Sequence, residues 1–153
     1  MARSGEIIVL NELAHATCHC ADRFAAAARV CADSYRGLVL EQGCDDRRRL
    51  LVDILRCMLL RGVPVPEARH AITPPPPAVL TGVDLDVLWI DVEFAERKLH
   101  RAMAKAIKNP ELSEPVRELL SVHYLRFKLH HDELGEIADR HVAPTLGLEQ
   151  RPT

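Results

Sequence analysis

The sequence is poor in aromatic residues, in long apolar runs and in excess charge of either sign. Phe, Trp and Tyr make up 4% of the 153 residues, and the formal net charge is -2. Broad nucleic-acid binders carry a strong positive charge, and proteins that hold single strands carry aromatic stacking platforms. No stretch approaches the roughly 20 consecutive apolar residues that a membrane-spanning helix needs. We therefore expect no nucleic-acid partner and no membrane insertion.

The familiar catalytic motifs are also missing. The sequence has no phosphate-binding loop, no glycine-rich dinucleotide fingerprint and no nucleophile elbow. Its five cysteines are odd in number and lie within the first 57 residues. Cys18 and Cys20 lack the Cys-x-x-Cys redox spacing, and on a helix their side chains would diverge by about 200°. With no secretory signal visible, these features favour a cytoplasmic protein with reduced thiols, and a non-catalytic protein over an enzyme.

Apolar residues recur at alternating steps of three and four along most of the chain, which is the spacing of helices with one buried face. We predict four helices, over residues 5–31, 34–61, 83–107 and 114–143. Asp33 or Ser34 is expected to cap the second helix, Gly62 to end it, and Ser113 to cap the fourth. The predicted fold is an all-α, antiparallel four-helix bundle within residues 1–144. A flexible tail is expected over residues 145–153.

The connection between the second and third helices cannot be helical throughout. Residues 63–82 include the run Pro74–Pro77, which favours extended polyproline II geometry. A connection of this length suits a span along the bundle, and spacing is the usual role of so short a proline run. The alternative is an adaptor function, in which this run recruits a proline-recognising partner.

The third helix is apolar on two sides. Its main stripe consists of Leu85, Leu88, Val92, Ala95, Leu99, Ala102 and Ala106. Val87, Ile90 and Phe94 form a second apolar stripe on the far side. A helix with two apolar faces is either central or buried in an interface. Because we expect only four helices, the interface interpretation gains weight, and we predict a homo-oligomer.

Arg47 lies on the apolar stripe of the second helix. An unpaired buried charge would cost several kcal/mol, so an inward Arg needs a carboxylate partner. We expect Asp22, Glu93 or Glu96 to supply it. Arg47 and Asp22 are thus candidates for a structural polar network that sets the register of the helices.

Histidines and glutamates on the third and fourth helices allow a competing interpretation as ligands of iron or zinc. Metal sites in helical bundles are built from inward carboxylates and Glu-x-x-His pairs on facing helices. The candidate ligands are Glu93, Glu96, His100, His123, His130 and His131. Glu96 and His100 are four residues apart, not three. His123 and His130 are two turns apart, about 10.5 Å, which is too far for one ion. The simpler interpretation is two core-edge histidines, each hydrogen-bonded to a carboxylate or a carbonyl.

A second group of possible ligands lies on the outer face of the first helix. His15, Cys18, His19 and Asp22 occupy neighbouring turns there and could bind zinc or copper. Their outward position favours a solvated face instead.

Several short segments carry a family resemblance: residues 10–13 (Leu-Asn-Glu-Leu), the joint at residues 32–34, and scattered positions in the later helices. These scattered positions are Arg47, Leu50, Asp53, Glu93, Glu96, His131 and Asp132. In these respects the chain resembles a bacterial ferritin-like bundle family of unknown function. The resemblance implies a four-helix fold, no established reaction and a link to stress or metal handling. Three functions follow as hypotheses: a self-associating, non-catalytic bundle, a metal-binding or di-iron protein, and an adaptor.

Overall fold

The structure, a computed structural model, describes the backbone of residues 4–64 and 85–150 and the side chains of residues 5–64 and 85–133. Its elements are the helices α1 (Ser4–Val30), α2 (Ser34–Leu60), α4 (Leu85–Ile107) and α5 (Glu114–Gln150). The described residues contain no strand, so the prediction of an all-helical chain with four helices is confirmed. None of the described helices combines the length and the apolar character that crossing a membrane requires.

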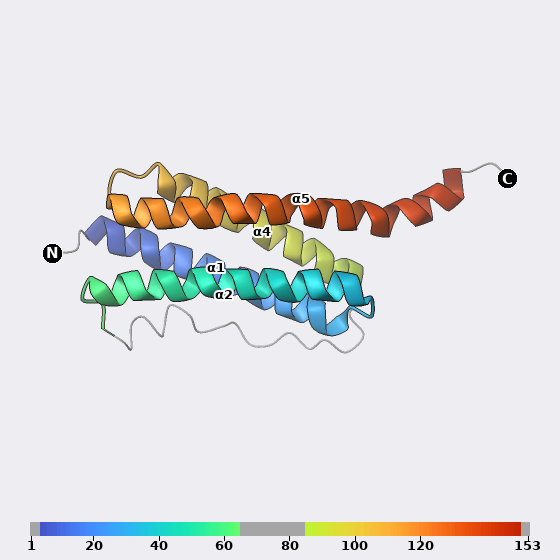
Figure 1. The fold of residues 1–153 in the computed structure, drawn as a ribbon, viewed down its shortest axis with the longest axis horizontal. Helices are drawn as coiled ribbons and strands as arrows, with labels where there is room; N and C mark the ends of the chain where they lie inside the picture. The colour runs from blue at the N-terminus through green and yellow to red at the C-terminus, as the bar shows by residue number, and fades with distance from the viewer. Residues whose placement is uncertain (1–3, 65–84, 151–153) are drawn as a thin grey trace.

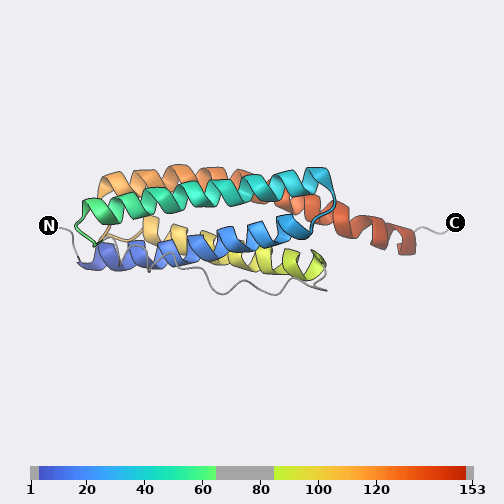
Figure 2. The ribbon, with the colours of Figure 1, turned by 90° about the horizontal axis from the view of Figure 1, so that it is seen from below.

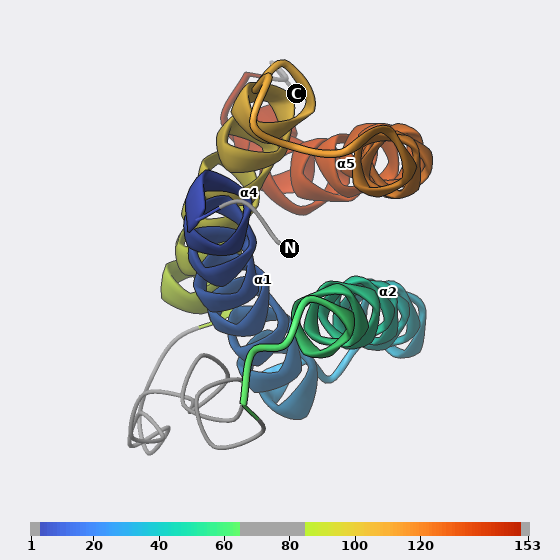
Figure 3. The ribbon, with the colours of Figure 1, turned by 90° about the vertical axis from the view of Figure 1, so that its left-hand side faces the viewer.

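The four helices lie in a ring around one core. α1 and α5 run in one direction, and α2 and α4 run in the other (Figure 1 and Figure 2). α1 packs against α2 and α4, and α5 packs against the same two helices (Figure 3). The end of α2 and the start of α4 lie at opposite ends of the bundle (Figure 1). The connection between them, with the predicted spacer at Pro74–Pro77, lies outside the described residues.

Two of the predicted helix boundaries follow from local chemistry. Asp33 is the N-cap of α2, and its Oδ1 atom accepts a hydrogen bond of 2.9 Å from the backbone N–H of Arg36. Gly62 follows the last turn of α2 with a φ of 84°, a left-handed conformation that glycine adopts without strain. Both residues therefore act as predicted, Asp33 as the cap and Gly62 as the stop.

Three polar residues tie helix ends together. Arg61, the C-cap of α2, forms an ion pair through Nε with Oε1 of Glu6 in α1. Nη2 of Arg61 donates to the Oγ atom of Ser113 at 2.9 Å, and the backbone N–H of Ser113 donates to Oε2 of Glu6 at 2.7 Å. The Ser113 hydroxyl, predicted to cap the fourth helix, thus accepts a bond from Arg61 and links α2 to the start of α5.

α5 is longer than the sequence pattern predicts. The expected end lies near Ala143, before a tail over residues 145–153, whereas α5 continues through Pro144 to Gln150. The predicted end is therefore wrong. Proline removes one backbone hydrogen bond and crowds the carbonyl four residues earlier, so it can bend a helix without ending it. The ribbon of α5 bends near this end and projects beyond the other helices (Figure 1 and Figure 2).

The core consists of the predicted apolar stripes. Its fully buried large side chains include Phe24 of α1, Ile54 of α2, Leu99 of α4 and Phe127 of α5. Gly43 leaves room on α2 for a side chain of α1 and a side chain of α5. A Cβ atom at Gly43 would lie 2.5 Å from Cε1 of Phe24 and 2.7 Å from Cε1 of His130. α2 is continuous across this glycine.

Candidate functional site

A buried ion pair lies at the centre of the bundle. Arg47 of α2 is 0% exposed and Glu96 of α4 is 1% exposed. Nε of Arg47 donates to Oε2 of Glu96 at 3.2 Å, and Nη2 pairs with Oε1, so the contact is bidentate. Of the three carboxylates considered for Arg47, the structure thus pairs it with Glu96. No described contact joins Arg47 to Asp22, which is half-buried on α1.

The rest of the Arg47 guanidinium is also engaged. Its Cζ atom lies 4.4 Å from the ring centre of Phe24 and 4.3 Å from that of Phe127, so the cation is held between two aromatic faces. Nη1 donates to the carbonyl oxygen of Gly43 at 3.2 Å and lies 3.3 Å from Nδ1 of His130. The charge is therefore compensated by hydrogen bonds, aromatic faces and a carboxylate.

The protonation state of His130 follows from its two neighbours. A guanidinium can only donate, so Nδ1 of His130 must accept from Arg47 and carry no proton. Nε2 then carries the proton and donates to the carbonyl oxygen of Val39 at 3.3 Å. Burial, and next the positive charge of Arg47, lower the pKa of His130 from its ordinary value of 6.5. His130 is thus neutral, and it is bonded to a carbonyl, one of the two kinds of partner that were predicted.

Glu96 collects contacts from α1 and α4 as well as from α2. The thiol of Cys20 donates to Oε2 of Glu96 at 3.4 Å. Nε2 of His100 lies 3.1 Å from Oε1 of Glu96, although without the angle of a hydrogen bond. Burial alone would raise the pKa of Glu96, but His100 and Arg47 outweigh it and lower this pKa to about 2. All four helices therefore contribute to one central polar cluster, formed by Cys20, Arg47, Glu96, His100 and His130.

The six proposed metal ligands do not converge. Glu93 is half-buried and pairs with Arg97 at 3.7 Å. The ring centres of His100 and His131 lie 5.4 Å apart, and His131 is exposed. Within the part of the chain that the structure describes, no three His, Cys, Asp or Glu side chains form a group able to hold a metal ion. The cation beside Glu96 is the guanidinium of Arg47.

His123 belongs to a separate contact between α5 and α2. Its Nε2 atom lies 2.8 Å from Oδ2 of Asp53, and its buried Nδ1 atom has no hydrogen-bond partner among the described residues. The pair lines a groove of about 640 Å³ that also contains Arg48, Arg49 and Arg126. The interpretation of His123 as a core-edge histidine bonded to a carboxylate is confirmed.

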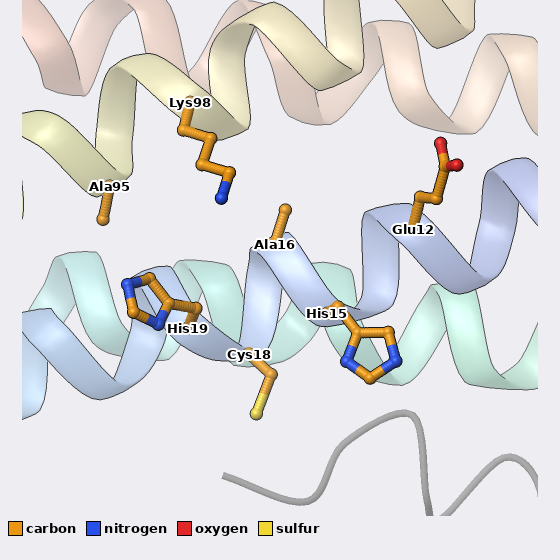
Figure 4. Close-up of a pocket in the computed structure, with 7 residues that line it drawn as sticks. All are labelled: Glu12, His15, Ala16, Cys18, His19, Ala95 and Lys98. Atoms are coloured by element: carbon orange, nitrogen blue, oxygen red, sulfur yellow. The ribbon is translucent and has the colours of Figure 1, made fainter. Parts of the chain in front are cut away.

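The outer face of α1 borders another groove, of about 580 Å³, between α1 and α4. Glu12, His15, Cys18 and His19 are spread along α1 and point in different directions (Figure 4). Lys98 reaches into the same groove from α4 (Figure 4). His15, Cys18 and His19, three of the possible zinc or copper ligands of this face, thus do not surround one point.

The outward sides of α4 and α5 carry large apolar side chains. On α4, Val87, Ile90 and Phe94 are 53%, 64% and 68% exposed, and we call them the α4 outer stripe. On α5, Val122, Leu125 and Leu129 are 62%, 63% and 73% exposed, and we call them the α5 outer stripe. Each stripe follows the spacing i, i+3, i+7, which places its members on one face of the helix. Each stripe thus gathers three exposed apolar side chains on one face of its helix.

No protein-family model, no curated protein and no solved structure matches this chain. The ferritin-like resemblance therefore remains a prediction that rests on the residues quoted for it.

Some members of these contacts were not among the predicted site residues. Cys20 was considered only for its spacing from Cys18, and Asp53 only as part of the family resemblance. Glu6 is 4% exposed and lies four residues before the fully buried Leu10. That spacing places Glu6 on the inward face of α1, which is the signal that could have identified it.

Proposed function

We propose that this protein is a ferritin-like, antiparallel four-helix bundle that works as a non-catalytic, self-associating scaffold. The exposure of the α4 outer stripe and the α5 outer stripe carries this proposal. Phe94 and Leu129 are 68% and 73% exposed, while the core stripes of the same two helices are buried. Large contiguous apolar surface is uncommon on monomers and is typical of interaction sites. A further copy of the chain would remove that surface from water.

The buried position of the central polar cluster supports a structural role over a catalytic one. A catalytic acid or base must come within hydrogen-bonding reach of its substrate. Arg47 and Glu96 are 0% and 1% exposed, and both carboxylate oxygens of Glu96 already contact Arg47. A pKa of about 2 keeps Glu96 ionised near neutral pH, so it is a poor general base. The cluster is therefore suited to fixing the positions of the helices.

We also place the protein in the cytoplasm. Its five cysteines, all among the described residues, form no disulfide. Burial raises the pKa values of Cys20, Cys44 and Cys57, which keeps these thiols protonated and slow to react. Reduced, inert thiols are usual in proteins of the reducing cytoplasm.

A metal-handling role is a second candidate, supported by the position of His100. This side chain lies between Glu96, at 3.1 Å, and His131, at 5.4 Å between ring centres. Titration of the untagged protein with Fe²⁺ and with Zn²⁺, followed by elemental analysis after dialysis, tests this role. Stoichiometric retention that His100→Ala abolishes would support it, and absence of retained metal would remove it. The adaptor hypothesis concerns Pro74–Pro77, which lies outside the described residues.

Sedimentation velocity at micromolar concentration tests the scaffold proposal. We expect a species of at least twice the 17.1 kDa mass of one chain. Replacing all six members of the two outer stripes with Ser should give a monomer. Leu38→Ser with Val52→Ser, at sites on α2 that are 62% and 51% exposed, is the matched control and should leave the assembly unchanged. A wild-type protein that sediments as a monomer would overturn the proposal.

A further inference from the structure

The outer side of α4 changes character along its length. Its N-terminal half carries the α4 outer stripe together with Asp86, Asp91 and Glu93. Its C-terminal half carries four exposed basic residues: Arg97, Lys98, Arg101 and Lys105. Glu96, the remaining acid of the helix, is buried and paired with Arg47. The outward surface is thus acidic and apolar at one end and basic at the other.

The outward positions of α4 also have the period of a coiled-coil seam. The residues concerned are Val87, Ile90, Phe94, Arg97, Arg101 and Ala104, separated by alternating steps of three and four. An average step of 3.5 residues keeps a stripe facing a second helix over several turns. A straight helix therefore fits this face as a partner.

On the basis of the proposed self-association, we propose that the occupant of this face is α4 of a second copy of the chain, packed antiparallel across a twofold axis near Phe94. In a twofold contact each copy presents the same surface to the other. An antiparallel arrangement places the acidic half of each α4 beside the basic half of the other. A parallel arrangement would place acid beside acid and base beside base, which is unfavourable.

The two flanks of the seam place the axis at the same position. Asp91 and Lys98 are two turns apart on one flank. If Asp91 pairs with Lys98 of the partner subunit, the twofold axis lies between residues 94 and 95. Glu93 lies on the opposite flank, and Arg97 lies at the edge of the seam on that same side. Pairing Glu93 with Arg97 of the partner subunit puts the axis at residue 95. Both pairings bring Phe94 next to Phe94 of the partner subunit. The charges thus select one register.

The flank that carries Asp91 and Lys98 is the one beside α1. The pKa of His19 in α1 is lowered by burial first, and Lys98 and Asp91 are among the charges that shift it. Figure 4 shows Lys98 extending from α4 toward α1. Both charges therefore lie on the same side of the α4 outer stripe, as the proposed pairing requires.

A register centred on Ile90 would bring the most apolar side chains of the two copies together, but it is unfavourable for two reasons. Centring the axis on Ile90 would bring Asp86 close to Glu93 of the partner subunit, and like charges facing each other are destabilising. The area is also insufficient: side chains of this exposure offer roughly 100 Å² each, so three from each copy bury roughly 600 Å². A stable interface needs about 1,000 Å² or more. The register centred on Phe94 adds the aliphatic stems of Arg97 and Arg101.

The α5 outer stripe does not offer this arrangement. Its nearby charges do not divide into an acidic and a basic half: Glu118 and Asp132 lie at the two ends, with Arg126 and Lys128 between them. No single antiparallel register then pairs every acid with a base. The charge pattern therefore assigns the twofold seam to α4 and leaves the α5 outer stripe as additional apolar surface of the assembly.

Charge exchange across the seam tests the proposed register. In a dimer of the Asp91→Lys variant, each introduced lysine would face Lys98 of the partner subunit. In a dimer of the Lys98→Asp variant, each introduced aspartate would face Asp91 of the partner subunit. We expect each variant to weaken dimerisation by about tenfold or more in sedimentation equilibrium. An equimolar mixture of the two variants should associate as tightly as the wild-type protein, because every pair across the seam is again of opposite charge. Residues 91 and 98 are too far apart in one helix to pair with each other.

The controls separate this register from self-association in general. Glu41→Lys reverses an exposed charge on α2 and should associate like the wild type. Circular dichroism of each variant establishes that it is folded. If the wild type associates and both seam variants associate equally well, the α4 register is wrong while the scaffold proposal stands. If both variants are monomeric and their mixture stays monomeric, the antiparallel pairing is wrong. A monomeric wild type would overturn both proposals.

Discussion

Each face of α4 carries side chains that a surface helix does not usually place there. Its inner face holds an ionised carboxylate, Glu96, that is 1% exposed, while its outer face holds Phe94, which is 68% exposed. The inner charge has its partner within the same chain, in Arg47. The outer apolar side chains are exposed although the core is already filled. The folding of one copy thus explains the inner face, and the proposed self-association would explain the outer one.

The two ion pairs of α4 differ in the same way. Glu96 is paired with Arg47 away from solvent, whereas Glu93 pairs with Arg97 at 3.7 Å with side chains that are 39% and 63% exposed. Breaking a buried pair leaves an uncompensated charge and costs about 3–5 kcal/mol. An exposed pair four residues apart contributes about 0.3–0.5 kcal/mol. Two pairs three residues apart along one helix therefore differ roughly tenfold in their expected effect.

The largest expected effect comes from removing the buried cation. Arg47→Met should lower the free energy of unfolding by about 3–5 kcal/mol, because Glu96 would be left buried and unpaired. Urea denaturation monitored by circular dichroism measures it. The double variant Arg47→Met with Glu96→Leu should recover most of the loss, since no buried charge remains.

The exposed pair supplies the matched control for this variant. Glu93→Gln should change stability by no more than about 0.5 kcal/mol. If Arg47→Met proved as mild as Glu93→Gln, the guanidinium could not be the counter-charge of the core.

Acidification should lower the free energy of unfolding in two stages, through two groups on the inner side of the bundle. The folded protein holds His130 neutral with a lowered pKa, so below its ordinary pKa of 6.5 the unfolded chain binds a proton that the folded chain does not. Glu96 stabilises fully above its ordinary pKa of 4.5, and this contribution is lost as the pH falls toward about 2. Each proton contributes a slope of up to about 1.4 kcal/mol per pH unit.

Unfolding free energies at pH 7.5, 5.5 and 4 measure this prediction. His130→Gln should flatten the change between pH 7.5 and 5.5, since it removes the titrating ring. An identical pH dependence in this variant would show that His130 is not the group responsible.

Gly43 and Gly37 provide a matched pair of smaller effects on α2. Gly43→Ala should destabilise by about 1–3 kcal/mol, because the new methyl group would lie 2.5 Å from the ring of Phe24, which stacks on Arg47. Gly37→Ala meets nothing within 4 Å and should stabilise by up to about 1 kcal/mol through helix propensity. Thermal unfolding of both variants measures these two changes in stability. Equal stabilisation by the two alanines would mean that α1 and α5 do not pack this closely on Gly43.

Much of the inner face could be predicted from the sequence. The three-four periodicity places Arg47, His123 and His130 on inward stripes, and all three are buried. Whether Arg47 pairs with Glu96 or with Asp22 depends on how far each helix is rotated about its own axis. Periodicity fixes that rotation only to within a residue or two. The role of Gly43 was not predictable, because a propensity scale records its cost in α2 but not the two rings packed against it.

The boundaries and the outer face show where sequence reasoning stops. Asp33 and Gly62 act through local hydrogen bonds and backbone angles, so their roles were correctly predicted. The fourth helix was predicted to end at residue 143, directly before Pro144, but proline is compatible with a bent helix, and the local sequence does not distinguish the two outcomes. The second apolar side of α4 was visible in the spacing of Val87, Ile90 and Phe94. The partner proposed for that side is a second molecule, which the spacing within one chain does not identify.

The outer face should contribute almost nothing to the stability of a single copy. Each of Val87→Ser, Ile90→Ser and Phe94→Ser should change the unfolding free energy, measured at nanomolar concentration, by no more than about 0.5 kcal/mol. A loss of several kcal/mol at that dilution would mean that these side chains are packed within their own chain.

The dependence of the thermal unfolding midpoint on protein concentration tests the difference between the two faces most directly. Association stabilises a folded chain by mass action, so the midpoint of the wild type should rise as its concentration increases from nanomolar to tens of micromolar. In the variant with Ser at positions 87, 90 and 94 this rise should be reduced, whereas Arg47→Met should lower the midpoint at every concentration. A wild-type midpoint that does not change with concentration would contradict the account.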